Sequence, residues 1–304
     1  HSSGEEYATS VKVSDSAFPT TKFSKTTVNP RIAIKYELTP SLVLRANVGT
    51  GFRAPYGFSE DLHLCSGSPR VWKSSNLKGE RAISYNLSAD YYAKKYQFSI
   101  NIFRTNLKDK IQFSPADDEV KKFGYSYQWE NVDDAYVQGV ELGAKANLFR
   151  NFNAGINWTF NQGKFKHERA DWSDPNDETV KEFPQRLQYA KDSRNISRFP
   201  AMTGDIDLDY TPGTWTFSLT SSLQGRMFID YNSEDDGATS KIKKTNTFMI
   251  FNCRAAKRFG TCTVYAGAKN IFSYIQDEKH TDDAAFMYAP VYGATWYVGL
   301  SVKL

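Results

Sequence analysis

His63 is the side chain of this 304-residue chain whose type and setting best suit ligand chemistry. It lies in the segment FSEDLHL, residues 58–64, within a long predicted loop that also contains Arg53. Imidazole is a common ligand in binding sites, which makes His63 a candidate ligand-binding residue. The alternative is structural: His63 tethers its loop to neighbouring strands, and Arg53 pairs with Glu60 or Asp61 instead of contacting a ligand.

Two tyrosines, Tyr127 and Tyr288, are candidates for stacking on a ligand because they lie nearest to the tips of predicted loops. The competing interpretation places them in an aromatic girdle where a membrane meets water, together with other aromatic residues near strand ends. Those residues are Tyr125, Trp129, Tyr231, Phe286 and Tyr292. Both interpretations put these side chains at the loop end of the strands.

Carboxylates gather in two predicted loops, where closely spaced oxygen ligands would suit calcium. They are Asp171, Asp174, Asp177 and Glu178 in the longest loop, and Glu234, Asp235 and Asp236 in another. Their spacing fits no EF-hand pattern, so a solvated, charged loop is the simpler interpretation. The same holds for His167 and His280, and the sequence leaves the question of a bound metal open.

The three cysteines form no CxxC pair and no Cys/His zinc spacing. Cys253 and Cys262 flank a predicted turn around residues 257–258, and in a two-residue hairpin they would face each other. Directly opposed Cα atoms of an antiparallel pair are roughly 4.5–5.5 Å apart, which is within disulfide range. The sequence therefore leaves two alternatives, a Cys253–Cys262 disulfide or two unpaired cysteines.

Catalytic motifs are absent from the sequence. The chain contains no G-x-S-x-G, no H-E-x-x-H and no phosphate-binding glycine loop. A net charge of +4, from 38 Lys and Arg against 34 Asp and Glu, is too balanced to indicate nucleic-acid binding. We therefore expect a binding or transport protein rather than an enzyme, with no resident cofactor.

The elements that would position these residues are β-strands in which apolar and polar side chains alternate. The alternation is clearest in residues 80–93, 152–164 and 291–304. Successive side chains of a strand point to opposite faces, so each of these strands has one apolar and one polar face. Asp205, Asp207 and Asp209 share a face, and three carboxylates in a row require water or partners. The polar face is therefore expected to be hydrated.

Short and long connections alternate along the chain. Tight turns are predicted near residues 39–41, 94–95, 150–151, 211–213 and 257–260. Long loops are predicted near residues 52–79, 114–134, 165–198, 231–245 and 275–290. Transmembrane β-barrels have this asymmetry, with short turns inside and long loops outside, whereas a soluble β-sandwich has no reason for it. The predicted fold class is all-β, an antiparallel transmembrane barrel wall of about 11–12 strands.

The chain divides into an N-terminal segment, residues 1–30, and a barrel region, residues 31–304. Two origins stay open for residues 1–4, the remnant of an affinity tag or an internal start after a cut, and residues 7–13 are a candidate first strand or loop. No run approaches the ~20 apolar residues that a membrane helix requires. The mean hydropathy of −0.55 still fits a barrel, because only every second residue of its strands meets lipid.

Six segments, in this order, resemble the C-terminal half of the barrel of TonB-dependent outer-membrane receptors of the Bacteroidetes type. They are ANVGTGFRAP (46–55), FSEDLHL (58–64), LKGERAISYNLSADYY (77–92), NVDDAYVQGVELGAKANLF (131–149), GAKNIFSYIQ (267–276) and FMYAPVYGATWYVGLSVKL (286–304). The first and third are specific in combination, and together the segments cover most of the barrel region. The terminal Leu304 departs from the aromatic residue that ends many outer-membrane barrels.

The resemblance implies an outer-membrane receptor whose complete barrel has about 22 strands and an N-terminal plug. It implies uptake of a scarce, bulky nutrient such as a ferric siderophore, haem or cobalamin, with His63 as a haem ligand. The implied partners are the plug and the other barrel half, a TonB-type energy-coupling protein, a surface lipoprotein and the lipid bilayer. The alternatives are an outer-membrane barrel enzyme and an adhesin or glycan-binding β protein.

Overall fold

The structure, a computed structural model, describes most of the barrel region and a short segment before it. The described residues are 25–55, 71–73, 77–115, 118–122, 127–167, 194–232, 240–276 and 288–303. The predicted strand near residues 7–13, His63, and the carboxylates of the two acidic loops lie outside them. In the described part, no helix is both long and apolar enough to cross a membrane.

Fourteen strands and one short helix, α2 (Asp118–Lys121), make up the described elements. The strands are β1 (Arg31–Thr39), β2 (Leu42–Arg53), β3 (Val71–Lys73), β4 (Glu80–Tyr92), β5 (Tyr96–Pro115), β6 (Tyr127–Phe149), β7 (Phe152–Phe165), β8 (Met202–Tyr210), β9 (Trp215–Gln224), β10 (Phe228–Asn232), β11 (Ser240–Lys244), β12 (Phe248–Phe259), β13 (Cys262–Lys269) and β14 (Thr295–Val302).

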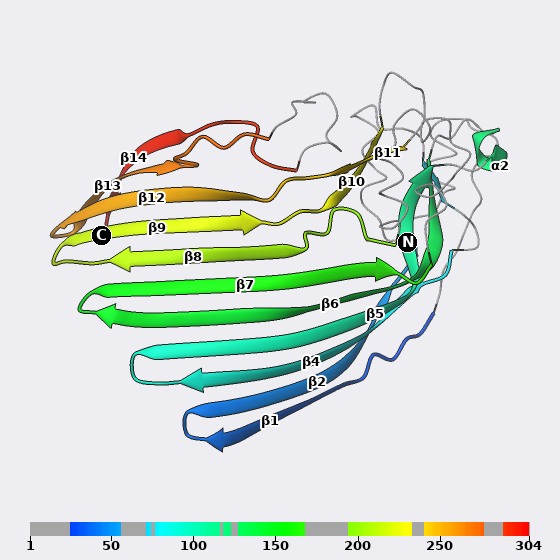
Figure 1. Cartoon of the computed structure of the whole chain (residues 1–304), viewed down its shortest axis with the longest axis horizontal. Coiled ribbons are helices and arrows are strands. Elements are labelled where there is room, and N and C mark those ends of the chain that lie inside the picture. Colours follow the sequence, from blue (N-terminus) through cyan, green and yellow to red (C-terminus); the bar gives the residue numbers. More distant parts are fainter. Residues whose placement is uncertain are drawn as a thin grey trace.

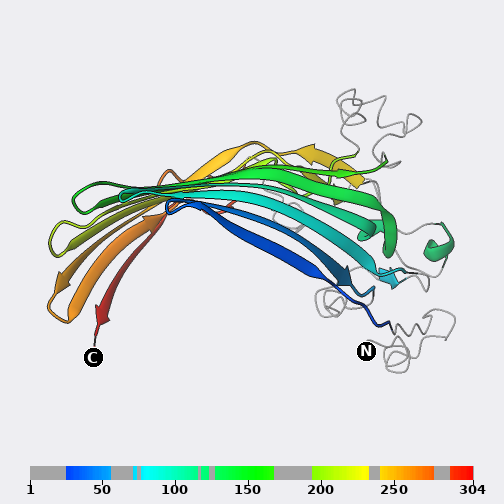
Figure 2. The same ribbon diagram turned by 90° about the horizontal axis from the view of Figure 1, so that it is seen from below.

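Twelve of the strands form one curved sheet (Figures 1 and 2). Along its main path the order is β1-β2-β4-β5-β6-β7-β8-β9-β12-β13-β14, and neighbours on this path are antiparallel. The small strand β3 pairs with β6 in parallel, and β10 and β11 form a separate hairpin. Among the described residues, β1 and β14 are each paired on one side, so the sheet is a section of wall with two edges. The predicted all-β, antiparallel architecture is confirmed.

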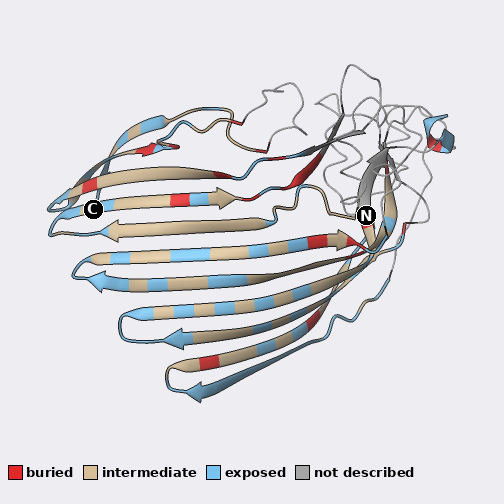
Figure 3. Cartoon of the chain, viewed as in Figure 1, coloured by how far each residue is buried: buried red, intermediate tan, exposed pale blue. Residues whose placement is uncertain are grey.

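The two faces of the sheet differ in chemistry, as the alternation predicted. One face, called the apolar face below, carries large exposed hydrophobic side chains, such as Ile32 (70% exposed), Leu87 (57%) and Val298 (84%). Figure 3 shows exposed residues alternating with half-buried ones along many of the strands. The other face, called the polar face, carries Asn47, Asp205 and the residues paired with them across the strands, such as Asn86 and Asn157. An apolar surface this extensive is characteristic of contact with lipid or with another protein.

The tight turns lie together at one end of the sheet, near the C-terminus in Figure 1. They close the hairpins β1–β2, β4–β5, β6–β7, β8–β9 and β12–β13, as expected from the sequence. Asn151, Gly213 and Gly260 have φ values of 66°, 63° and 60°, a left-handed conformation that glycine and asparagine adopt readily. The connections at the opposite end are long, and this end is called the long-loop end below.

Several predicted boundaries at the long-loop end are wrong. The strands β5 and β6 extend to Pro115 and Tyr127, so their connection is shorter than the predicted loop 114–134. Register shifts on both sides of Lys110 change the face to which the following side chains point. The alternation of apolar and polar residues is therefore interrupted there, and for this reason the strand extensions were not predicted. Residues 231–245, predicted as a loop, contribute to the β10–β11 hairpin, and the predicted strand 214–230 is interrupted after Gln224.

Of the two alternatives left open for Cys253 and Cys262, the structure has the unpaired cysteines. The strand β12 continues to Phe259, so the turn falls at Gly260 and Cys262 is paired with Phe259. Cys253 is paired with Ala268, and both cysteines are free thiols. Moving the turn by a few residues separates two cysteines that a turn at residues 257–258 would have opposed.

Candidate functional site at the long-loop end

The polar face is covered by side chains that bond to one another across the strands. Ser84 and Thr105 hydroxyls are 2.9 Å apart, and Asn86 Nδ2 donates to Asn47 Oδ1 at 3.0 Å. Further along the sheet, Asn157 Nδ2 donates to Asp205 Oδ2 at 2.8 Å. Such cross-strand pairs stabilise a sheet whose face is wet, because each polar group has a partner as well as access to water. The hydrated face predicted from the aspartate row is consistent with this arrangement.

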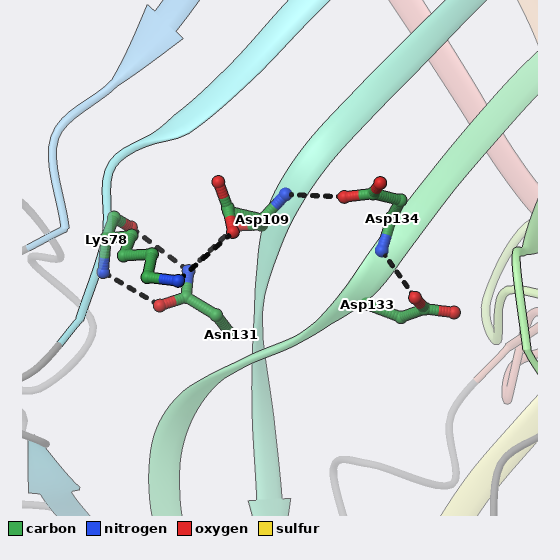
Figure 4. Close-up of polar contacts among 5 residues, drawn as sticks. All are labelled: Lys78, Asp109, Asn131, Asp133 and Asp134. Atoms are coloured by element: carbon green, nitrogen blue, oxygen red, sulfur yellow. Dashed lines mark hydrogen bonds and ion pairs between the residues drawn. The ribbon is translucent and has the colours of Figure 1, made fainter.

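Asn131 fastens the start of β4 to β5 and β6 at the long-loop end (Figure 4). Its Nδ2 donates to the carbonyl oxygens of Lys78, at 3.0 Å, and of Asp109, at 2.8 Å, and its Oδ1 accepts from the Lys78 amide at 2.8 Å. Asp109 has a φ of 53°, and its amide donates to Asp134 Oδ1 at 3.1 Å. One asparagine thus satisfies backbone groups of two other segments where the ladder is broken by the bulge.

Asp133 holds the end of β7 in the same region. Its carboxylate accepts from the His167 amide at 2.7 Å, lies 3.0 Å from His167 Nδ1, and accepts from the Asp134 amide at 2.8 Å. Partial burial opposes ionisation of Asp133, but these hydrogen bonds and the attraction of His167 together lower its pKa below the ordinary value. Asn131, Asp109, Lys78, Asp133, Asp134 and His167 are called the rim network below.

A small apolar cluster anchors the connections near β12 and β14, toward the opposite edge of the sheet from β1. It consists of Met227, Ile229, Phe248 and Tyr288, all buried, with Tyr274 stacked on Phe248 at 4.8 Å between ring centroids. Gln276 Oε1 accepts from the Tyr288 backbone amide at 3.3 Å, and the Gln276 backbone amide donates to the Pro290 carbonyl oxygen at 2.9 Å. The cluster therefore joins the β10–β11 hairpin, the start of β12 and the segment before β14.

Asn270 terminates β13 and fixes the chain that follows it. Its φ is 51°, its amide donates to Asn252 Oδ1 at 3.0 Å, and its Oδ1 accepts from the Tyr274 amide at 2.9 Å. Its Nδ2 donates to the carbonyl oxygens of Tyr274, at 2.7 Å, and of Tyr292, at 3.2 Å. The asparagine of the segment GAKNIFSYIQ therefore has a defined structural role.

Of the candidate ligand-binding residues, the ones that the structure describes are not gathered at one point. Arg53 is the last residue of β2 and lies opposite Glu80 of β4 in the strand register. Its side chain is exposed. Tyr288 is buried in the apolar cluster, and β4 to β9 lie between it and Arg53 in the order of the sheet. Tyr127 begins β6, while His63 lies outside the described residues.

An aromatic girdle at the tight-turn end was not predicted. It consists of Tyr96, Phe98, Phe149, Phe152, Tyr210, Trp215, Phe217 and Phe259. The ring centroids of Trp215 and Phe217 are 5.6 Å apart, and Lys257 Nζ lies 4.8 Å from the Trp215 centroid and 5.0 Å from that of Phe259. The signal was present in the sequence, because each of these aromatics lies within a few residues of a predicted tight turn.

The described side chains at the long-loop end form a scaffold for the connections. The rim network and the apolar cluster hold the ends of long connections on a regular sheet, as scaffolds for binding loops do. Within the described residues, no group of three His, Cys, Asp or Glu side chains could hold a metal ion. The described side chains at this end thus support the long connections.

Comparison with known sequences gives one family. A family described as "TonB dependent receptor-like, beta-barrel" matches residues 5–271. Vitamin B12 transporter BtuB of Photobacterium profundum is 26% identical over 266 residues, which are 85% of this chain and 36% of that protein. Ferric enterobactin receptor of Pseudomonas aeruginosa is 27% identical over 151 residues, which are 44% of this chain and 20% of that protein.

Solved structures share the fold. Ferric citrate transporter FecA in its unliganded form has a TM-score of 0.62 at 20% identity, covering 90% of this chain and 37% of FecA. Copper transporter OprC has a TM-score of 0.59 at 21% identity, covering 89% of this chain and 38% of OprC. The chain therefore spans little more than a third of the length of these relatives.

Proposed function

Because the chain belongs to the TonB dependent receptor-like β-barrel family, a family of transporters and not of enzymes, we propose that it forms part of the wall of an outer-membrane uptake receptor. The observation that carries this proposal is the difference between the faces of the sheet. The hydrophobic rows of the apolar face would meet acyl chains, and the polar face would line a hydrated interior. The long connections between β2 and β4, β5 and β6, β7 and β8, β9 and β12, and β13 and β14 would then be extracellular.

Closing this wall requires further strands. An exposed edge such as that of β1 or β14 presents unpaired backbone groups, which cannot be tolerated in a bilayer. We infer that other strands and a plug, from the same or a separate polypeptide, complete a barrel of about 22 strands. A TonB-type protein would supply energy through that part. The Bacteroidetes type, with a surface lipoprotein as partner, is our finer proposal and rests on the segments 46–55 and 77–92.

The cargo would be a scarce, bulky nutrient, and the relatives suggest its class. Two of them are named for vitamin B12 and for ferric enterobactin, so cobalamin and ferric siderophores are candidates, with haem as a third. We propose that His63, Arg53 and Tyr127 contribute to the site. Tyr288 is proposed to act by fixing the loop before β14 rather than by reaching the ligand, because its side chain is buried.

Membrane placement can be tested with single-tryptophan variants in vesicles that contain brominated acyl chains. Trp215 and Trp296 lie on the apolar face, and Trp296 is 76% exposed, so bromine should quench both strongly. Trp129 packs against Leu77 and Ile111 at the long-loop end, and it serves as the control that stays bright. Equal quenching of the three, or none, would contradict the proposed orientation.

Cargo is tested by titrating the assembled receptor, purified from outer membranes, with cobalamin, haem and a ferric siderophore. We expect one of the three to bind, and cells that lack the protein to lose uptake of the same compound. His63→Ala should weaken haem binding if haem is the cargo. A protein that resides in the outer membrane but binds none of these compounds, and supports no uptake, would refute the assignment.

A further inference from the structure

The apolar face changes its chemistry at one level across three neighbouring strands. The last apolar row there is Ile102, Val140 and Phe160, in β5, β6 and β7. The next outward-facing row is Arg104, Gln138 and Gln162, and these three are joined by hydrogen bonds. Arg104 Nη1 donates to Gln138 Oε1 at 2.6 Å, and Gln138 Nε2 donates to Gln162 Oε1 at 2.9 Å. A polar row of this kind marks the upper boundary of the surface that can contact hydrocarbon.

Beyond this row, a groove of about 910 Å³ opens on the same face. Its lining includes six cationic residues from separate segments of the chain: Lys25, Arg81, Arg104, Lys108, Lys166 and Arg194. Asp134 is the one acidic side chain among its described lining residues. In the part of the chain that the structure describes, Arg81, Lys108 and Lys166 are exposed and make no ion pair with a carboxylate. The groove therefore has a strong, uncompensated positive charge.

The strand register explains how these cations come together. Arg81 of β4 is paired with Lys108 of β5, so their side chains lie on the same face of neighbouring strands. Lys108 is four residues beyond Arg104, a distance of about 13 Å along the strand. The Lys166 amide donates to the Asp134 carbonyl at 2.8 Å, which places Lys166, just past the end of β7, beside Asp134 of β6. The Arg104 guanidinium lies over the Tyr136 ring, 4.4 Å from its centroid, and is thus held at the boundary.

A second, apolar groove begins where the cationic groove ends. It has a volume of about 690 Å³ and is lined by Ile32, Ile34, Ala46, Val48, Leu87 and Ile102, among others. Arg104 lines both grooves, so the two meet at this residue. One continuous surface therefore offers cations at its upper end and aliphatic side chains below.

We propose that this surface binds a membrane lipid whose headgroup carries phosphate groups. The cations Arg81, Arg104, Lys108 and Lys166 would bind the phosphates through charge-assisted hydrogen bonds. The aliphatic groove would hold an acyl chain of the same molecule. A free phosphate ion would use only the cationic groove, so the lipid is the occupant that accounts for both. The proposal rests on the membrane placement in the proposed function, but it is independent of cargo.

The test uses the assembled protein, extracted from membranes and placed in phosphatidylcholine nanodiscs that contain diphosphoryl lipid A or the same lipid with its phosphates removed. Native mass spectrometry counts the lipid that remains bound after release. The triple variant Arg81→Gln, Lys108→Gln, Lys166→Gln is compared with a control that loses the same charge at the tight-turn end, Lys94→Gln, Lys95→Gln, Lys257→Gln. Circular dichroism verifies that both variants are folded.

We expect the wild type and the control to retain the diphosphoryl lipid, and the groove variant to bind it about a hundredfold more weakly, at roughly fivefold for each cation removed. Equal retention by the groove variant and the wild type would overturn the proposal. Equal retention of the dephosphorylated lipid would also overturn it, as would full displacement of the lipid by inorganic phosphate. If bromine quenches Trp215 and Trp296 but lipid retention does not depend on the phosphates, the lipid-binding proposal alone fails. If bromine does not quench these tryptophans, the membrane placement fails as well.

Discussion

Phe103 lies across Gly139 on the polar face, where the two residues are directly paired between β5 and β6. A Cβ atom on Gly139 would lie 2.8 Å from Phe103 Cζ and 2.3 Å from the carbonyl oxygen of Phe160. The aromatic ring can therefore lie flat on a hydrated face only because its neighbour has no side chain. This contact connects packing to function, since it keeps a large side chain close to the wall that would line the interior.

Gly139→Ala should destabilise the protein by about 1–3 kcal/mol, because the added methyl group meets backbone as well as the ring. The matched control is Gly51→Ala, also on the polar face, where the added Cβ would meet only Ala82 Cβ at 3.7 Å. Urea unfolding in detergent micelles, followed by tryptophan fluorescence, measures both. Equal midpoints for the two variants would show that Phe103 does not depend on the glycine.

Asn131→Ala should loosen the start of β4 without unfolding the sheet. The variant loses three hydrogen bonds that join Lys78 and Asp109, and the net cost is about 1–3 kcal/mol because backbone groups lose their partner. Hydrogen exchange read by mass spectrometry should rise in peptides that contain residues 77–80 and 109–111. Asn153→Ala is the control, since its side chain is exposed and makes no hydrogen bond in the described structure. Unchanged exchange around Lys78 would contradict the role of Asn131.

Acidification should release the His167 end of β7 through Asp133. Since folding lowers the pKa of Asp133, the carboxylate contributes stability that is present above the ordinary aspartate pKa and is lost as the pH falls through the lowered value. Amide exchange at His167, corrected for its intrinsic pH dependence, should therefore increase in acid. Asp133→Asn should remove most of this dependence, and a wild-type profile in that variant would exclude Asp133 as the titrating group.

Cys253 and Cys262 should be alkylated after denaturation without any reducing agent, because both are free thiols. In the folded, membrane-inserted protein, a water-soluble maleimide should react more slowly with Cys253 than with Cys262, which follows the Gly260 turn at the membrane edge. Peptide mass spectrometry distinguishes the two sites. Labelling that requires prior reduction would restore the disulfide between them.

Local patterns in the sequence were sufficient to predict that apolar and polar side chains alternate along the strands. They were also sufficient to predict that the tight turns lie together at one end of the sheet. Side-chain alternation follows from strand geometry alone, and turns such as Arg150–Asn151 and Gly260–Thr261 are made by residues adjacent in the chain. The same patterns therefore indicated a wall with an apolar and a hydrated face. They could not specify the position of the β12–β13 turn within a few residues, and the cysteine pairing depended on it.

The tertiary structure decided which distant residues meet. No segment of the sequence is strongly basic, yet pairing of β4 with β5, and of β6 with β7, brings Arg81, Lys108 and Lys166 to one groove. The rim network depends in the same way on the bulge at Asp109, which changes the register that the alternation implies. Lateral pairing and register are non-local quantities, set by the summed contacts of whole strands, and for that reason single-strand patterns do not contain them.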